Sequence, residues 1–510
     1  MTKKYYLTTP LYYVNAAPHI GHAYTTVAAD VLARFMRQHG KSVHFLTGTD
    51  EHGAKIEKVA QEAEVSPQAY ADKISAEFRE LWAHLDVHYD DFIRTTEERH
   101  VAAVKKAFQA LLKSGDIFKG RYEGFYCVAD ETYWTKTEAP EDAKGRRLCP
   151  NPECRRPLET VQEDSYFFRL SRYQEKLLAL YRDNPGFLMP TSRAPEILRF
   201  VEGGLQDISV SRTKVKWGIP VPGDEAHTIY VWLDALLNYA SAVWGESGPS
   251  PELWPADVHI VGKEIYRFHA VIWPAMLMAL GVEPPRRVFA HGWWTVEGEK
   301  MSKSKGNFVD PRHITAEFGV DALRYFLLRE MPFGNDGDFS FEAMKKRYNA
   351  ELANDLGNLV NRTVDMVDRF LGGELPTKES AVPLSFLKNS PEKIEEALAE
   401  NLENLGFSTA LASIWSVIGE LNAYINAESP WKIAKTDPER TRRVLFGLVQ
   451  ALRRVAGWLG PFMPQTAAKI QAQLGVRRFP APLSAEEVLA GAEKGIGKIQ
   501  KAPPLFPRKP

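Results

Sequence analysis

The first fifty residues read as a strand, a helix and a second strand, an order that favours a parallel sheet. Tyr5–Thr9 is rich in aromatic and β-branched residues, which suit a pleated, half-buried surface. After a turn-rich loop, apolar residues recur every three or four positions in Ala23–Phe35 and predict a helix that stops at Gly40. Ser42–Leu46 predicts the second strand. A βαβ unit of this kind binds ligands at the carboxyl ends of its strands.

Two histidines, His19 and His22, stand in the first turn of the predicted helix. Residues three apart share a helix face, so both imidazoles would point the same way, beside free backbone N–H groups and the positive end of the dipole. This is an anion site that suits a phosphate, and Gly21 would let a bulky ligand approach the backbone. An ordinary surface or core role for the two histidines stays open.

Length, charge and cysteine content narrow the class of protein. A chain of 510 residues is too long for one core and suggests roughly three or four domains. No apolar run of about 18 residues is present, and the start lacks a signal-peptide run, so we expect a cytoplasmic protein without a membrane span. Three cysteines exclude a disulfide framework. With a net charge of −1, any nucleic-acid surface must be local.

Thr47–Gly53 places polar residues after the second strand. Asp50 is well placed to hold an ammonium group, although a lone aspartate here could simply cap a helix. Helical patterns follow at Pro67–Leu85 and Glu97–Ser114.

The segment from Ile117 to about Pro222 mixes aromatic and charged residues with turn signals. Within it, Cys127, Asp130, Cys149 and Cys154 form two short groups, CVAD and CPNPEC. Such groups resemble a structural zinc site, in which aspartate is a harder but permitted ligand. Three reduced cysteines without a metal are the alternative.

Strand and helix patterns return after this segment. His227–Val231 predicts a strand, and Trp232, Ala235 and Tyr239 then share one face of a helix, as core or as an apolar slot. Further patterns are a strand at Val258–Gly262, a helix at Ile265–Leu280 and a strand at Val288–Ala290. Two such blocks around an insertion of about a hundred residues predict a split nucleotide-binding fold.

A short lysine-rich loop, Glu299–Asn307, precedes a predicted helix at Pro311–Phe318. Its Lys300 and Lys303 are mobile point charges suited to a polyphosphate, although a basic loop is often only a solvated turn.

The chain beyond about Phe341 predicts an amphipathic α-bundle, because apolar residues step by three and four in two long stretches. These residues are Phe407, Leu411, Ile414, Ile418, Leu421 and Ile425, and then Leu445, Leu448, Leu452, Val455 and Leu459. Polar and aromatic residues interrupt the pattern at Asn358, Arg362 and Trp431, for which capping and packing are the plain explanation. The proline-rich tail from Ala502 predicts loose coil.

Several of these stretches carry a family resemblance. PHIGH and KMSKS are the two signatures of class I aminoacyl-tRNA synthetases, and they occur in the expected order. TPLYYVNAAPHIGHAYT, TGTDEHG, YVWLDALLNY, GKEI, HGWWTVEGEKMSKSKGN and NAESPW together resemble bacterial methionyl-tRNA synthetases along essentially the whole chain.

The resemblance implies a Rossmann-type parallel-sheet catalytic domain, split by a connective-peptide insertion and followed by an all-α anticodon-binding domain. The implied parts are 1–116 and 226–297 for the two catalytic halves, 117–225 for the insertion, 298–345 for the KMSKS loop and stem-contact segment, and 346–510 for the helical domain.

The resemblance also implies the activity. L-methionine and ATP would give methionyl-adenylate and pyrophosphate, and the methionyl group would pass to the 3′-terminal adenosine of initiator and elongator tRNA(Met). Mg²⁺ would bind through the phosphates, with one structural Zn²⁺ in the insertion. Because the chain stops too soon for an appended tRNA-binding domain, we expect a monomer.

The family's site residues map onto this chain in five groups. By this resemblance the catalytic and phosphate-binding groups are His19, His22, Lys300 and Lys303, while Gly262 and Glu264 line the adenosine. The methionine-binding residues are Leu11, Tyr13, Asp50, Trp232, Ala235, Tyr239 and His291. The anticodon readers are Asn358, Arg362 and Trp431, and the zinc ligands are Cys127, Asp130, Cys149 and Cys154. Leu236 departs from the family, some of whose members have proline there.

Two alternatives compete with this prediction. A synthetase for leucine, isoleucine or valine would usually carry a far larger insertion with an editing site. A non-catalytic tRNA-binding relative would have no need of the histidines and lysines in the two signatures.

Overall fold

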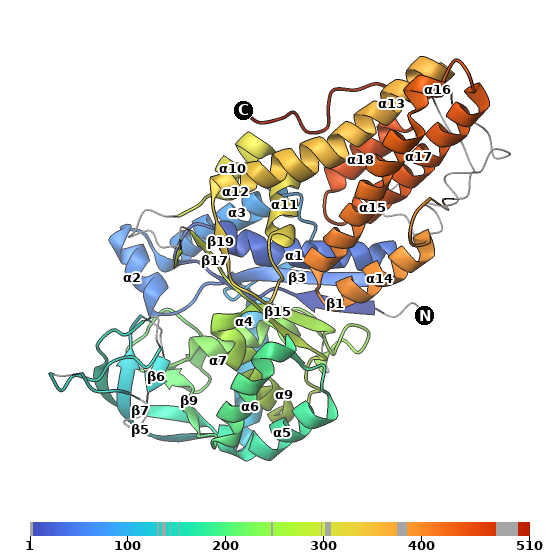
Figure 1. The fold of residues 1–510 in the computed structure, drawn as a ribbon. Coiled ribbons are helices and arrows are strands. Elements are labelled where there is room, and N and C mark those ends of the chain that lie inside the picture. The colour runs from blue at the N-terminus through green and yellow to red at the C-terminus, as the bar shows by residue number, and fades with distance from the viewer. Residues whose placement is uncertain are drawn as a thin grey trace.

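A computed structural model places a central sheet between an insertion and a helical bundle (Figure 1). It describes residues 4–129, 132–134, 139–142, 144–151, 154–245, 248–296, 298–300, 308–374, 384, 386–475 and 498–510. None of the helices within these ranges is long and apolar enough to cross a membrane.

The central sheet has seven parallel strands, as the βαβ pattern predicts. They are β1 Lys4–Thr8, β2 Tyr12–Tyr13, β3 Ser42–Asp50, β4 Asp91–Arg94, β8 Leu188–Met189, β15 Val258–Gly262 and β16 Val288–His291. From β1, the first half of the chain builds outward through β3 to β4, whereas β15 and β16 extend the other side. The strand order therefore reverses between β1 and β15, where α/β sheets form their ligand crevice.

Helices cover both faces of this sheet. Along β1, Tyr6 belongs to one hydrophobic core and Leu7 to the other, as expected for alternating side chains of a doubly covered strand. The helices of this region are α1 Ile20–Gln38, α2 Ala54–Glu62, α3 Pro67–His84, α4 Glu98–Ser114, α9 Trp273–Ala279, α10 Pro311–Phe318 and α11 Val320–Arg329. A short helix, η3 Lys263–Ile265, and a π-helical stretch, η4 Phe268–Ile272, precede α9, where Pro274 lacks an N–H donor.

The insertion consists mainly of antiparallel strands (Figure 1). One sheet holds β5 Ile117–Cys127, β6 Thr132–Trp134, β7 Glu159–Phe168 and β9 Ile208–Ser209, and another holds β10 Ser211–Arg212, β11 Pro220–Val221 and β12 Asp224–Ile229. Its helices are η1 Leu170–Tyr173, α5 Gln174–Asp183, η2 Thr191–Arg193 and α6 Ala194–Glu202. Because β8 pairs with β16, the insertion also contributes an edge strand to the central sheet.

Two short helices, α7 Val231–Leu236 and α8 Asn238–Ser241, lead from the insertion back to the sheet. The hairpin strands β13 Trp244–Gly245 and β14 Gly248–Pro249 follow them. A small sheet of β17 Trp294–Val296, β18 Glu299–Lys300 and β19 Gly337–Phe339 then connects to the bundle.

The C-terminal part is the expected helical bundle (Figure 1). Every apolar residue of the two predicted stretches is buried, because the three-and-four spacing puts them on one face of α15 and α17. The elements are α12 Phe341–Arg347, η6 Tyr348–Gly357, α13 Asn358–Leu371, α14 Pro391–Glu403, α15 Phe407–Glu428, α16 Pro430–Ile433, α17 Pro438–Leu459 and α18 Pro464–Gln473. The predicted fold class, α/β followed by all-α, is confirmed.

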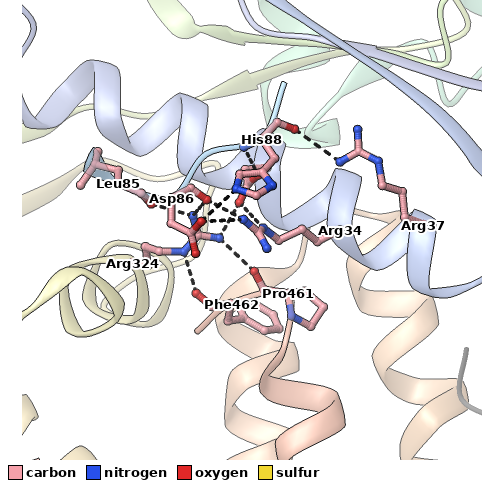
Figure 2. Close-up of polar contacts among 9 residues, drawn as sticks. Arg34, Arg37, Leu85, Asp86, His88, Arg324, Pro461 and Phe462 are labelled. Carbon is pink, nitrogen blue, oxygen red and sulfur yellow. Dashed lines mark hydrogen bonds and ion pairs between the residues drawn. The ribbon is translucent and has the colours of Figure 1, made fainter. Parts of the chain in front are cut away.

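A buried arginine joins the bundle to the sheet region (Figure 2). Arg324 of α11 lies 2.6 Å from the Asp30 carboxylate of α1, and both side chains are fully buried. Its guanidinium also donates to the carbonyl oxygens of Phe462 and Pro461, at 2.9 and 3.0 Å, and to that of Leu85 at 3.2 Å. One cation thus ties α1, the turn after α3 and the turn after α17 together.

Candidate active site

A cavity of about 370 Å³ opens at the carboxyl ends of β1, β3, β15 and β16, where the strand order reverses. It collects all the residues that the family resemblance assigns to methionine and adenosine, together with the two histidines: Leu11, Tyr13, His19, His22, Asp50, Trp232, Ala235, Tyr239, Gly262, Glu264 and His291. These residues come from distant parts of the chain, so the folded sheet brings together the two halves of the predicted split fold.

The two histidines lie at the start of α1, with their rings 3.8 Å apart and nearly parallel. His19 is the N-cap residue, and its Nδ1 accepts from the Gly21 N–H at 3.0 Å, while His22 Nδ1 accepts from the His19 N–H at 3.2 Å. The Ile20 N–H donates to the Val309 carbonyl. The prediction of free backbone N–H groups was therefore wrong for these three residues. Since Nδ1 accepts in both rings, the ring proton sits on Nε2, which can donate to an anion.

Burial keeps the histidines of the cavity neutral. It lowers the pKa of His19 to about 4, and it lowers the pKa of His22 well below the usual range, with a further contribution from His19. A neutral imidazole is a hydrogen-bond donor without a full charge, so both rings can stay in one protonation state through the physiological range.

The aromatic wall of the cavity has defined orientations. Trp232 stacks on Phe268, with ring centroids 3.8 Å apart. The Tyr239 hydroxyl lies 2.7 Å from His269 Nε2, and His269 Nδ1 lies 2.9 Å from the Ile265 carbonyl. The carbonyl can only accept, so His269 donates from Nδ1 and accepts from Tyr239. Trp232, Ala235 and Tyr239 therefore form a wall of the cavity. The sequence alone left open whether these residues line a slot or only pack in the core.

The protonation state of His269 can be tested through the pH dependence of the free energy of unfolding. Its pKa is lowered to about 4 by burial, so between pH 6.5 and 4 the unfolded chain binds a proton that the folded chain does not. We expect the free energy of unfolding to fall as the pH drops through this window, by about 1.4 kcal/mol per pH unit for such a histidine. Denaturant unfolding at several pH values measures this. A His269→Gln variant should show a shallower slope, and an unchanged slope would contradict the prediction.

Other residues of the cavity were missed by sequence reasoning. Thr25 Oγ1 lies 2.8 Å from His291 Nε2, and the spacing of three from His22 could have revealed it. The Trp293 side chain donates through Nε1 to the Glu264 carboxylate. Asn238, the first residue of α8, also lines the cavity. Asn238 lies three residues after Ala235, so the same spacing could have revealed it, whereas Trp293 lies between β16 and β17 and carried no periodic signal.

Gly262 lies at the end of β15, directly beside the Glu264 carboxylate. A Cβ atom at Gly262 would lie 2.4 Å from Glu264 Oε2, so any other residue here would displace the Glu264 carboxylate from its present position. The glycine therefore allows the carboxylate to lie against the end of the strand.

Three cysteines of the insertion lie together. The Sγ atoms of Cys127, Cys149 and Cys154 all lie within 4.8 Å of one another, and those of Cys127 and Cys154 are 3.4 Å apart. Thiolates around a tetrahedral zinc at about 2.3 Å would be roughly 3.8 Å apart, so the three residues fit such a metal. Asp130 lies outside the described residues.

Two of the three predicted anticodon residues, Arg362 and Trp431, lie together in the helical bundle. The Arg362 guanidinium lies 5.2 Å from the Trp431 ring centroid and donates to Asn426 Oδ1 at 3.0 Å. Trp431 is 42% exposed, unusual for a tryptophan, and Asn358 is exposed one turn before Arg362 in α13. The predicted phosphate-binding Lys303 and the side chain of Lys300 lie outside the described residues.

Family models match almost the whole chain. The model described as tRNA synthetases class I (M) matches residues 5–364, and the anticodon binding domain of methionyl tRNA ligase matches residues 376–507. With the parallel sheet and the cavity at its switch point, these matches define a class I aminoacyl-tRNA synthetase.

Individual relatives specify the family further. The methionine–tRNA ligase of Caldanaerobacter subterraneus subsp. tengcongensis is 48% identical over 520 residues, covering 100% of this chain and 79% of that protein. That of Streptomyces coelicolor is 47% identical, covering 99% and 97%. The Mycobacterium tuberculosis methionyl-tRNA synthetase in complex with methionyl-adenylate matches with a TM-score of 0.91 and 40% identity, over 99% of this chain and 100% of that one. The chain belongs to the methionyl-tRNA synthetase family.

Proposed function

We propose that this chain activates L-methionine with ATP and transfers the methionyl group to the 3′-terminal adenosine of tRNA(Met). In the first step, a methionine carboxylate oxygen attacks the α-phosphate, and the bond to the departing pyrophosphate breaks. Negative charge builds up on the phosphate oxygens, so positioning and electrostatic stabilisation are the chemistry required. The observation that carries this proposal is the cavity in which His19 and His22 share one site with an aromatic wall and Asp50.

The two ends of methionine fit different parts of this cavity. The Asp50 carboxylate suits the α-ammonium group, while Trp232, Tyr239 and Leu11 offer an apolar surface for the thioether, which packs well against aromatic rings. Tyr13, Ala235 and His291 complete the lining on this side.

The residues proposed to bind ATP include the two histidines at the N-terminus of α1. The Nε2–H groups of His19 and His22 would donate to the phosphates, and Lys300 and Lys303 would neutralise the pyrophosphate. Gly262 and Glu264 would receive the adenosine, with the carboxylate accepting from the ribose. Mg²⁺ is expected to bind through the phosphates rather than through a cage of side chains.

The bundle would recognise the anticodon. An exposed Trp431, with Arg362 beside it, suits stacking on unpaired bases, while Asn358 and Arg362 can hydrogen-bond to base edges. That the enzyme serves both initiator and elongator tRNA(Met), and acts as a cytoplasmic monomer, stays a prediction.

Exchange of pyrophosphate into ATP tests the activity with each amino acid separately. We expect exchange that depends on methionine, with leucine, isoleucine and valine close to the background without amino acid. Exchange stimulated by leucine but not by methionine would refute the proposal in favour of a synthetase for another apolar amino acid.

The cysteine cluster gives a separate prediction. We expect the purified protein to carry about one zinc per chain, and Cys149→Ala to lose most of it, because three protein ligands hold the ion weakly. Elemental analysis measures this directly. Ser209→Ala, another small buried residue of the insertion, is the control and should keep its zinc. A wild-type protein free of zinc would contradict the assignment.

A further inference from the structure

Two motifs of the sequence each contain a buried titratable residue that the proposed function leaves unused. His52 follows Asp50 by two residues in TGTDEHG, and Asp234 lies between Trp232 and Ala235 in YVWLDALLNY. Neither is among the residues that line the cavity. They nevertheless meet, because His52 Nδ1 lies 2.7 Å from Asp234 Oδ2, with side chains only 8% and 1% exposed.

The contact continues through a buried chain of hydrogen bonds. His100 Nε2 lies 2.7 Å from the other oxygen of Asp234, and His100 Nδ1 lies 2.8 Å from Ser241 Oγ. Ser241 Oγ donates to the Asn238 carbonyl at 3.2 Å, and the Asn238 amide donates to the Ala235 carbonyl. Asn238 and Ala235 both line the cavity. These hydrogen bonds therefore run from His52, two residues after Asp50, to two residues of the cavity lining, Ala235 and Asn238.

Charge makes this arrangement specific. Burial alone would raise the pKa of the Asp234 carboxyl, but the imidazoles of His52 and His100 together hold it below its usual value. Each oxygen of the carboxylate has its own imidazole donor. A buried carboxylate is costly without such partners, so a displacement of α7 from the end of β3 would take away one of its two imidazole donors.

A second anchor lies next to the first. Glu51, between Asp50 and His52, accepts from Arg94 through both oxygens at 2.7 and 2.9 Å, and from the Thr96 hydroxyl. Its side chain is fully buried. The backbone that carries Asp50 is thus fixed from two directions, towards β4 by Glu51 and towards α7 by His52.

We propose that His52 and Asp234 are positioning residues that set the affinity for methionine. They hold the strand end that carries Asp50 at a fixed distance from the helix that carries Trp232 and Ala235. This rests on the proposed function, in which the ammonium group and the thioether of one methionine bind to these two elements. ATP binding should depend on the pair much less, because His19 and His22 belong to α1, which lies outside this chain of hydrogen bonds.

The test compares His52→Leu with His52→Asn in pyrophosphate exchange. Leucine removes the donor, whereas the asparagine amide can donate from nearly the position of Nδ1. We expect the KM for methionine to rise about tenfold in His52→Leu, the loss of one charge-assisted hydrogen bond, and the KM for ATP to stay within about twofold. His52→Asn should stay close to the wild type.

A matched control and a milder variant make the outcome decisive. Tyr173→Phe also removes a hydrogen bond to a carboxylate, 3.0 Å from Asp116 in the insertion, and should leave both KM values unchanged. Equal rises of both KM values in His52→Leu, or no rise in either, would overturn the inference. If His52→Leu does not fold, Ser241→Ala decides: a selective rise in the KM for methionine supports the inference, and an unchanged value overturns it. Absence of methionine-dependent exchange in the wild type would refute the proposed function instead.

Discussion

Replacing His22 with alanine is expected to slow methionyl-adenylate formation about 100- to 1,000-fold, the usual effect of removing one donor from a developing negative charge. His22 is held by its Nδ1 contact to the His19 N–H, which leaves Nε2–H as the donor. The KM values for methionine and ATP should change little, because the contact strengthens as charge develops on the phosphate. Single-turnover formation of the adenylate, measured by rapid quench, separates this step from product release.

Two further variants locate the effect on one ring nitrogen. Glutamine places an amide nitrogen near the position of Nε2, so His22→Gln should recover part of the rate, whereas His22→Asn reaches only the Nδ1 position and should not. Affinity for tRNA should be unchanged in all three variants. Loss of tRNA affinity in parallel with activity would mean that the substitution disturbs the fold rather than the contact to the phosphate, and a wild-type rate in His22→Ala would contradict the phosphate role.

Local patterns predicted the elements well, because they arise from periodic burial. β15 and α10 have the predicted bounds, and α15 and α17 bury the predicted residues. The two blocks of strands also predicted the parallel sheet, whose strand order then fixes where the cavity lies. Long-range pairing was not predictable in the same way. β8 joins the edge of the sheet from inside the insertion through two residue pairs only, too short a strand to leave a sequence pattern.

In the candidate site too, residues in local motifs were predictable and contacts between distant segments were not. Residues in recognisable motifs, such as His19, Asp50 and Tyr239, were found in the cavity. The caps of α1 were not predicted, since the choice of acceptor for the first N–H groups depends on imidazole rotamers and on the approach of Val309. The His52–Asp234 contact spans 182 residues, and nothing in either local sequence indicates its partner.

Arg324 is the clearest case of a residue whose role the sequence conceals, and its replacement should have the largest effect on stability. In the pattern of α11 it reads as an ordinary charged residue, yet it is fully buried against Asp30 and several carbonyl oxygens. Arg324→Ala would take from the buried Asp30 carboxylate one of its two arginine partners, the other being Arg34 at 2.7 Å. We expect the free energy of unfolding to fall by about 3–5 kcal/mol, the usual result of removing one member of a buried ion pair. Denaturant-induced unfolding measures this.

Two further variants distinguish the effect of the buried charge on stability from the effect of lost side-chain packing. Arg182→Ala breaks an ion pair with Asp183 whose side chains are 73% and 67% exposed, and should leave the stability nearly unchanged, because water screens such a pair. The double variant Asp30→Leu, Arg324→Met removes both charges at similar volume and should be more stable than Arg324→Ala. Equal stability of Arg324→Ala and Arg182→Ala would contradict the role assigned to this cation.

The pH dependence of the Arg324→Ala effect adds a further test of this ion pair. Burial alone would raise the pKa of the Asp30 carboxyl, but Arg324, together with Arg34 and the His88 N–H, holds it below its usual value. A carboxyl with a lowered folded-state pKa stabilises the fold above its unfolded value of about 3.9, and this stabilisation is lost as the pH falls further. The unfolded chains of the wild type and of Arg324→Ala titrate alike, so the difference in stability depends only on the folded-state pKa of Asp30, which rises when Arg324 is removed. The difference should therefore be constant above that raised pKa and narrow as the pH falls below it, when the carboxylate of the variant takes up a proton. A difference that does not narrow as the pH falls to about 3 would mean that the effect comes from packing rather than from the charge on Asp30.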